Sequence, residues 1–191
     1  VMAGFMAMLT SQHRETRSLA EVLAALDLQK TLTAALADGS ACAYALNNPA
    51  IKTFNSTAAM SLASPQTIGV NQLHTNGDPA APVVAQVGVA SSPYSSSLIV
   101  SAISLQIVGG SGSSYLGNWL VSFDASKTVR QVRPISIGTT LTVDASTPAS
   151  AKIIGCQAAA SVSTSPINYQ IFRSNGTFTV PAGVTKLRVW V

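Results

Sequence analysis

The feature that most constrains the fold is a long, uninterrupted helical pattern at the start of the chain. Residues 1–38 contain a single glycine, Gly4, and no proline, and strong helix formers crowd residues 19–37. A helix of this length extends about 55 Å, which is longer than a compact domain of this size can accommodate along its whole length. We therefore predict that one end of the helix projects from the rest of the protein.

The first nine residues of this helix are apolar on all sides. The larger side chains among them are Val1, Met2, Phe5, Met6, Met8 and Leu9. A helix without a polar face is buried in lipid or among other helices, but crossing a bilayer takes about 20 residues. The basic start and small-residue cleavage site of a signal peptide are missing. The segment is predicted to be either the end of a longer apolar helix or part of an oligomer core.

An amphipathic stripe follows this apolar start. Four residues fall at i, i+3, i+4 and i+7, which is the spacing of one helix face: Leu19, Val22, Leu23 and Leu26. We expect these four side chains to pack the part of the helix that follows the apolar start on the rest of the domain. Arg17 and Glu21 are also spaced for an i, i+4 ion pair.

From residue 39 onward the pattern changes to that of a β protein. Charged residues make up only 9% of the chain, against about 25% in ordinary soluble domains, which suits an extracellular or fibre-forming β protein. Residues 40–82 carry turn signals and look irregular. Alternating segments then predict antiparallel strands at 83–89, 98–108, 119–123, 129–137, 140–143 and 152–156. Pro134 indicates an edge position or a bulge in its strand.

These patterns together predict an α+β fold, in which a long N-terminal α-helix packs on an antiparallel β-sheet head. The expected boundaries are a helix at 1–38 with a truncated apolar stem, a head at 39–156, and a small-residue linker at 157–166. Residues 167–191 are expected to begin a C-terminal β module, starting with a β-hairpin extension.

The chain contains two cysteines, Cys42 and Cys156. Neither belongs to a C-x-x-C motif, and the two histidines have no ligand spacing to them, so no zinc site is predicted. In an oxidising compartment the two thiols would be an obvious pair. Such a disulfide would close a loop of about 100 residues and stabilise the fold by up to ~4.7 kcal/mol. The alternative is two unrelated buried thiols.

We find no pattern that predicts an enzyme. The seven acidic residues include no pair placed for general acid and base catalysis, and residues 109–113 fit neither a nucleophile elbow nor a dinucleotide loop. Lys127, Arg130 and Arg133 form the nearest thing to a basic cluster, but no aromatic residues alternate with them. We therefore expect no catalytic residue, no metal, no cofactor and no nucleic-acid partner.

Residues 1–156 resemble the type IV pilin and pseudopilin family. The matching segments are VMAGFMAMLTSQHRETRSLAEVLAALDLQKTLTAALADGSAC and GNWLVSFDASKTVRQVRPISIGTTLTVDASTPASAKIIGC. The latter segment is similar to the strand–strand–Ile-x-Cys ending of many bacterial pilin-like proteins. The family's cleaved leader and its Glu near the mature N-terminus are not in this sequence. If the family is right, about 15 residues precede Val1 and complete a membrane-spanning helix.

The resemblance implies a structural subunit of a bacterial surface filament. Such subunits wait in the inner membrane and then assemble with like subunits through the N-terminal helix, which places the final filament outside the cell. Major pilin, minor pilin and pseudopilin all remain open. The tail, NGTFTVPAGVTKLRVWV, weakly resembles the start of a glycine-rich domain at the tips of phage tail fibres. It suggests an added distal module for adhesion, and hence a host or surface ligand.

The alternative is a trimeric phage tail fibre or surface adhesin, in which residues 1–37 form a coiled coil and the β region binds a receptor. A coiled coil needs heptads sustained over three or four repeats, and the apolar pattern here drifts instead. Neither an apolar start on all sides nor a cysteine pair is needed in such a fibre. A third option, a periplasmic solute-binding module, lacks convergent polar groups for a ligand.

Overall fold

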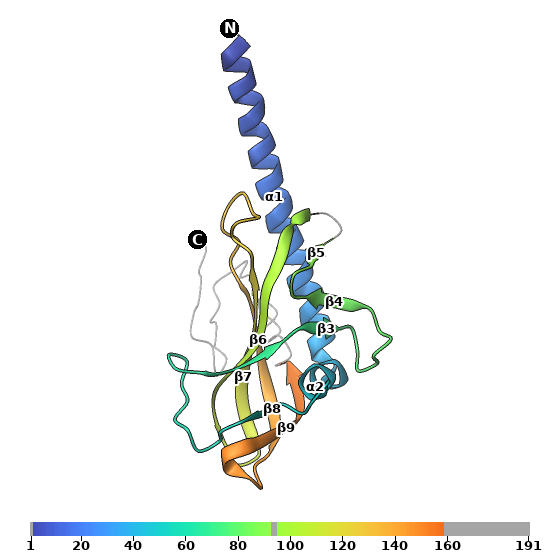
Figure 1. Cartoon of the computed structure of the whole chain (residues 1–191), viewed down its shortest axis with the longest axis vertical. Coiled ribbons are helices and arrows are strands. Elements are labelled where there is room, and N and C mark those ends of the chain that lie inside the picture. The colour runs from blue at the N-terminus through green and yellow to red at the C-terminus, as the bar shows by residue number, and fades with distance from the viewer. Residues whose placement is uncertain (1, 93–94, 159–191) are drawn as a thin grey trace, which may run out of the picture. The chain divides into compact units, whose positions relative to one another are not determined.

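The computed structural model describes residues 2–92 and 95–158, with side chains for residues 11–90 and 96–158. It opens with helices α1 (Met2–Ala37) and α2 (Gly39–Asn47), followed by strands and a short 3-10 helix at Pro148–Ser150 (Figure 1). The strands are β1 (Thr53–Phe54), β2 (Gln66–Val70), β3 (Gln72–His74), β4 (Val83–Gln86), β5 (Ala90–Ser92), β6 (Ser95–Ser111), β7 (Ser114–Phe123), β8 (Ile135–Asp144) and β9 (Ala151–Ala158).

The two helices meet at Asp38. Its backbone is extended, with φ −78° and ψ 111°, and its carboxylate accepts a hydrogen bond of 2.9 Å from the Ser40 N–H. This is the N-cap arrangement that starts a helix, so the chain leaves α1 and immediately begins α2. The sequence pattern predicts the stop at this position but not the additional helix, which lies in the stretch expected to be irregular.

The strands form one large antiparallel sheet and one small ladder. The main sheet runs in the order β1-β9-β8-β7-β6-β2, with β5 also paired to β6, and β3 pairs separately with β4. Residues of β8 alternate strictly between buried and exposed along the whole strand, as expected for a strand with one face on the core. The buried side encloses large side chains, including Trp119, Leu105 and Leu141.

The ends of this sheet approach each other. Asn55 directly follows β1, and Gln66 begins β2 at the opposite edge. The Gln66 side chain accepts a hydrogen bond from the Asn55 N–H at 3.0 Å and donates one to the Asn55 carbonyl at 2.6 Å. A side-chain amide therefore bridges the two edges where backbone pairing stops, and the sheet is a nearly closed barrel.

The prediction of an α+β fold with a pilin-like head is therefore wrong. Over the described residues the protein is mainly β: a nearly closed antiparallel barrel-like sheet with two α-helices, of which α2 ends at residue 47. The physical reason lies in residues 40–82, whose short strands carry too few residues to show a period. Two of those strands, β1 and β2, add to the edges of the sheet and allow it to curl around the main core.

The strands after residue 95 differ from the prediction mainly in their bounds. The strand predicted at 129–137 is wrong for residues 129–134, which form no strand, and its end joins the segment predicted at 140–143 in the single strand β8, which starts at Ile135, directly after Pro134. Proline has no N–H to give to a ladder, so a place just before a strand suits it. The predicted C-terminal β module at 167–191, and the linker beyond residue 158, lie outside the described residues.

Candidate functional site

The packing of α1 reverses the expectation drawn from its apolar stripe. Leu19, Val22, Leu23 and Leu26 are 65%, 48%, 65% and 57% exposed. The prediction that these four side chains pack the helix on the head is wrong, because they lie on the face turned away from the sheet. We call them the outer stripe. On the portion of α1 whose side chains are described, these four are the large apolar residues left uncovered.

The face of α1 that does pack on the sheet begins, toward the N-terminus, with small residues. Ala24 and Ala25 pack with Leu98 of β6, and Leu28, Leu32 and Leu36 continue into the main core. Alanine is small and lets a helix approach a strand closely. The alanine face therefore packs on the sheet, although its side chains carry less apolar surface than those of the outer stripe. The same helix therefore carries two apolar faces, of which one is packed against other described residues and the other is exposed among them.

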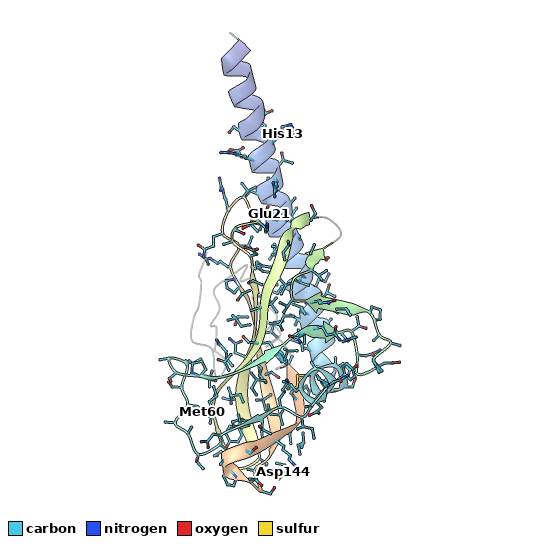
Figure 2. All side chains as sticks on the ribbon, viewed as in Figure 1. His13, Glu21, Met60 and Asp144 are labelled. Atoms are coloured by element: carbon cyan, nitrogen blue, oxygen red, sulfur yellow. A yellow bond between two sulfur atoms is a disulfide. The ribbon has the colours of Figure 1, made fainter. Side chains whose placement is uncertain are left out.

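A buried carboxylate lies close to the end of the exposed part of α1. Residues 11–17 are all exposed, and Figure 2 shows His13 on this exposed length and Glu21 at the junction. Glu21 is 1% exposed. Burial of a charged group is costly unless it is paired and hydrogen-bonded, so its partners decide what this residue does.

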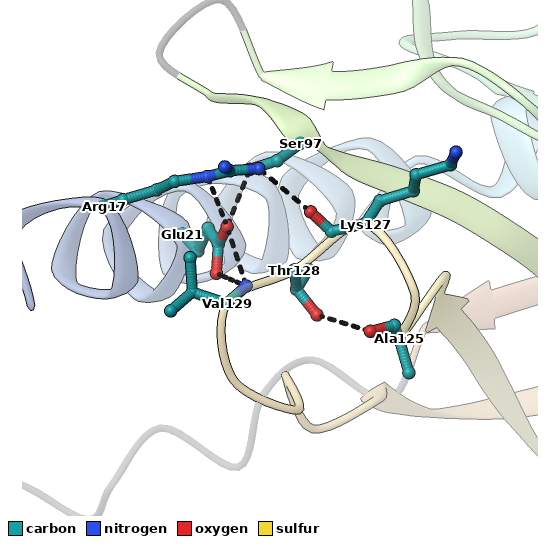
Figure 3. A network of polar contacts seen from close by, with 7 residues as sticks. All are labelled: Arg17, Glu21, Ser97, Ala125, Lys127, Thr128 and Val129. Carbon is teal, nitrogen blue, oxygen red and sulfur yellow. Dashed lines mark hydrogen bonds and ion pairs between the residues drawn. The ribbon is translucent and has the colours of Figure 1, made fainter. Parts of the chain in front are cut away.

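Three groups satisfy the Glu21 carboxylate (Figure 3). The Ser97 hydroxyl of β6 donates to Oε1 at 2.7 Å, and the Val129 N–H of the β7–β8 loop donates to Oε2 at 3.0 Å. Arg17 Nε lies 3.4 Å from Oε1, which is the ion pair expected from the i, i+4 spacing. One side chain thus fastens the helix to a strand and to a loop.

Arg17 extends this network to the loop backbone. Its Nη2 donates to the Lys127 carbonyl at 3.1 Å, while 56% of the side chain stays exposed (Figure 3). The guanidinium is therefore held on one edge by Glu21 and Lys127 and open to solvent elsewhere. The Arg17–Glu21 spacing is visible in the sequence, but Ser97 and Val129 lie 76 and 108 residues from Glu21, so no local pattern could place them together.

An open groove of about 570 Å³ lies between α1 and the same loop. Its cationic side chains are Arg14 and Arg17 of the helix and Lys127 of the loop, and the lining is completed by His13, Ser126, Thr128 and Val129. We call it the cationic groove. The sequence groups Lys127 with Arg130 and Arg133; the structure places Lys127 in the β7–β8 loop, opposite three helical residues.

Cys42 of α2 and Cys156 of β9 form a disulfide, with their Cα atoms 5.7 Å apart. Both residues are buried in the main core. The bond ties α2 to the strand at which the described part of the chain ends. The six apolar residues expected to form a filament core, Val1, Met2, Phe5, Met6, Met8 and Leu9, have side chains outside the described set, although the backbone is helical from Met2.

The histidines differ in their environments. His13 is exposed on the helix and lines the cationic groove. His74 is buried in β3: its Nδ1 lies 2.9 Å from the Ala81 carbonyl, and its ring packs edge-on against Tyr44. Within the described residues, no group of three or more His, Cys, Asp and Glu side chains is placed to hold a metal ion.

Three turns with the pattern Asp-x-Ser are built alike. Asp38, Asp124 and Asp144 each accept a hydrogen bond from the backbone N–H of the serine two residues later. These bonds stabilise the ionised carboxylate, and they hold the pKa of each of the three groups below its ordinary value of 3.8. For Asp124 the largest cause of the lowered pKa is the Ser126 hydroxyl, which donates at 2.7 Å.

These lowered pKa values predict a direction for the pH dependence. Because each folded pKa lies below the unfolded value of 3.8, the three turns contribute stability above that pH, and it is lost as the pH falls through the folded pKa values. The Ser126→Ala substitution should raise the pKa of Asp124 toward its ordinary value and leave Asp144 unchanged. A titration of the carboxyl resonances by NMR would measure both; an unmoved Asp124 would contradict the assignment.

Comparison with known proteins does not assign the chain to a family. No protein-family model, no curated protein and no solved structure matches it. Within the described residues, no helix is both long enough and apolar enough to cross a bilayer.

Proposed function

We propose that the chain is a non-enzymatic structural subunit of a bacterial surface filament, of the kind that type IV pilins form, and that copies associate through α1. The observation that carries the proposal is the outer stripe: four large apolar side chains left about half or more exposed along one helix face. Clustered exposed apolar residues commonly mark an interaction surface. The proposal rests on this helix and not on the fold of the sheet.

The spacing of the outer stripe suits packing against another helix. Residues at i, i+3, i+4 and i+7 form a continuous ridge, which packs into the groove of a neighbouring helix. Complete burial of a leucine or valine side chain contributes about 1.5–3 kcal/mol, so four half-exposed side chains can support a weak contact that gains strength by repetition. The same continuous helix also includes the apolar residues before Thr10.

The packing of α1 disfavours the trimeric coiled coil. In a coiled coil over residues 1–37, the lower half of the helix would face partner helices. Leu28, Leu32 and Leu36 of that half are instead buried in the protein's own core. The outer stripe ends at Leu26. It therefore suits contact between copies along the N-terminal part of α1, with the sheet of each copy lying outside the bundle of helices.

This proposal predicts that polar substitutions in the outer stripe prevent assembly. The purified full chain should form concentration-dependent oligomers in detergent-free buffer, and the Leu19→Gln/Leu23→Gln variant should sediment mainly as a monomer. The matched control is Leu62→Gln/Ile154→Gln, which changes two exposed apolar side chains away from α1 and should assemble like the parent. Sedimentation velocity distinguishes these results, and equal assembly of both variants would contradict the proposal.

A further inference from the structure

We propose that the cationic groove binds the phosphate of an anionic phospholipid headgroup. The inference rests on the proposed function, because a subunit that awaits assembly at a membrane would meet such lipids. Three arginine and lysine side chains line the groove, Arg14, Arg17 and Lys127, together with His13. Clusters of basic residues beside an apolar segment are attracted to anionic membrane surfaces.

One of these cations is already held in place. The Arg17 guanidinium is fixed by Glu21 Oε1 at 3.4 Å and by the Lys127 carbonyl at 3.1 Å, yet more than half of its side chain remains exposed. Because Glu21 is itself buried and bonded to Ser97 and Val129, Arg17 loses little freedom when it binds an anion. Such preorganisation lowers the cost of binding, and the guanidinium fork suits phosphate oxygens.

The acidic residues nearby do not neutralise all of the positive charge of the groove. Glu21 is the counter-charge of Arg17, and Asp124 interacts electrostatically with Lys127, so the positive charge of Arg14 is the surplus in the lining. Asp124, in the same loop, points its carboxylate at Ser126, accepting from the backbone N–H at 2.9 Å and from the hydroxyl at 2.7 Å. Glu15 is exposed on the helix but is not part of the lining.

The groove begins, along α1, at the depth of a lipid headgroup. With a rise of 1.5 Å per residue, His13 lies about 6 Å and Arg17 about 12 Å beyond Leu9, the last residue of the apolar start. The polar region of one leaflet is about 5–8 Å thick. If the apolar start enters the hydrocarbon, Arg14 lies within the headgroup layer, and Arg17 and Lys127, whose carbonyl accepts from Arg17, lie a few ångströms beyond it at its aqueous edge.

The test uses vesicles and a pair of charge-matched variants. The full chain is titrated with vesicles of phosphatidylcholine alone and of phosphatidylcholine mixed with phosphatidylglycerol, and bound protein is measured by co-sedimentation. We expect Arg14→Gln/Lys127→Gln to bind the mixed vesicles about 5- to 30-fold more weakly than the parent. The control is Lys30→Gln/Lys152→Gln, two exposed cations outside the groove, which should change binding less than twofold. Each variant removes two positive charges.

Three outcomes would overturn the inference: equal binding to both vesicle types, an equal loss for both variants, or no loss for either. A further arm titrates inorganic phosphate without vesicles and follows the Val129 amide by NMR. Saturation by phosphate with no preference for phosphatidylglycerol would assign the groove to a free anion and reject the lipid. If lipid binding fails while oligomers still form through the outer stripe, the inference is wrong and the proposed function stands.

Discussion

Replacing both cysteines by alanine, Cys42→Ala/Cys156→Ala, is expected to lower the free energy of unfolding by about 3–5 kcal/mol. The two residues are 114 apart in sequence, and cross-linking a loop of that length removes much of the entropy of the unfolded chain. Alanine avoids placing a hydroxyl in a site where both residues are buried. For a chain of this size, the change corresponds to a fall in Tm of about 6–20 °C.

The loss should be greatest locally at α2. This helix has nine residues, which is too short to be stable without tertiary contacts, and the disulfide is its covalent tie to β9. Urea unfolding of the oxidised parent, the reduced parent and the double variant would measure the effect, with hydrogen exchange reporting on residues 39–47. The reduced parent should resemble the variant. Equal unfolding free energies for all three proteins would show that the disulfide does not stabilise the fold.

Glu21→Ala is expected to destabilise the protein by about 2–4 kcal/mol. The substitution leaves the Ser97 hydroxyl and the Val129 N–H without the carboxylate that accepts their bonds, and losing a charged acceptor costs about 1.5–3 kcal/mol for each such bond at most. Arg17 is half exposed and can be solvated by water, so the cost stays below that of breaking a fully buried ion pair.

The control for this prediction is Glu15→Ala, which removes an exposed acid from the same helix and should change stability by less than about 0.5 kcal/mol. Glu21→Gln keeps an oxygen acceptor but loses the charge, so its effect should be intermediate. Equilibrium urea unfolding gives the stabilities, and hydrogen exchange should show faster exchange of the Val129 amide in Glu21→Ala. Equal stability of the Glu21→Ala and Glu15→Ala variants would show that Glu21 does not anchor α1 to the strand and the loop.

Local periodicity predicts the long elements of this fold but not the way its sheet closes. Helix α1 and the alternating strands β6, β7 and β8 could be predicted, because their periods are set by residues a few positions apart. The nearly closed barrel could not, because it depends on β1 and β2. Their pairing with β9 and β6 spans large sequence separations and carries no local signal.

Local spacing also fails to predict which residues of the candidate site are buried. The spacing of Leu19, Val22, Leu23 and Leu26 correctly indicates one helix face, but spacing does not say which neighbour covers that face. The sheet instead takes the face with Ala24 and Ala25 and buries the charged Glu21 beside it. A buried carboxylate can be placed only when its partners are known, and two of them come from β6 and from the β7–β8 loop.

The central claim, that copies of the chain associate through the outer stripe of α1, can be tested most directly by photo-crosslinking at Leu23. A photoreactive phenylalanine analogue at this position should join the chain to another copy, and mass spectrometry should locate the crosslink in residues 11–37 of that copy. The same analogue at Leu62, an exposed residue away from α1, should give little intermolecular product. Crosslinks from position 23 that stay within one chain, or that equal those from position 62, would contradict the claim.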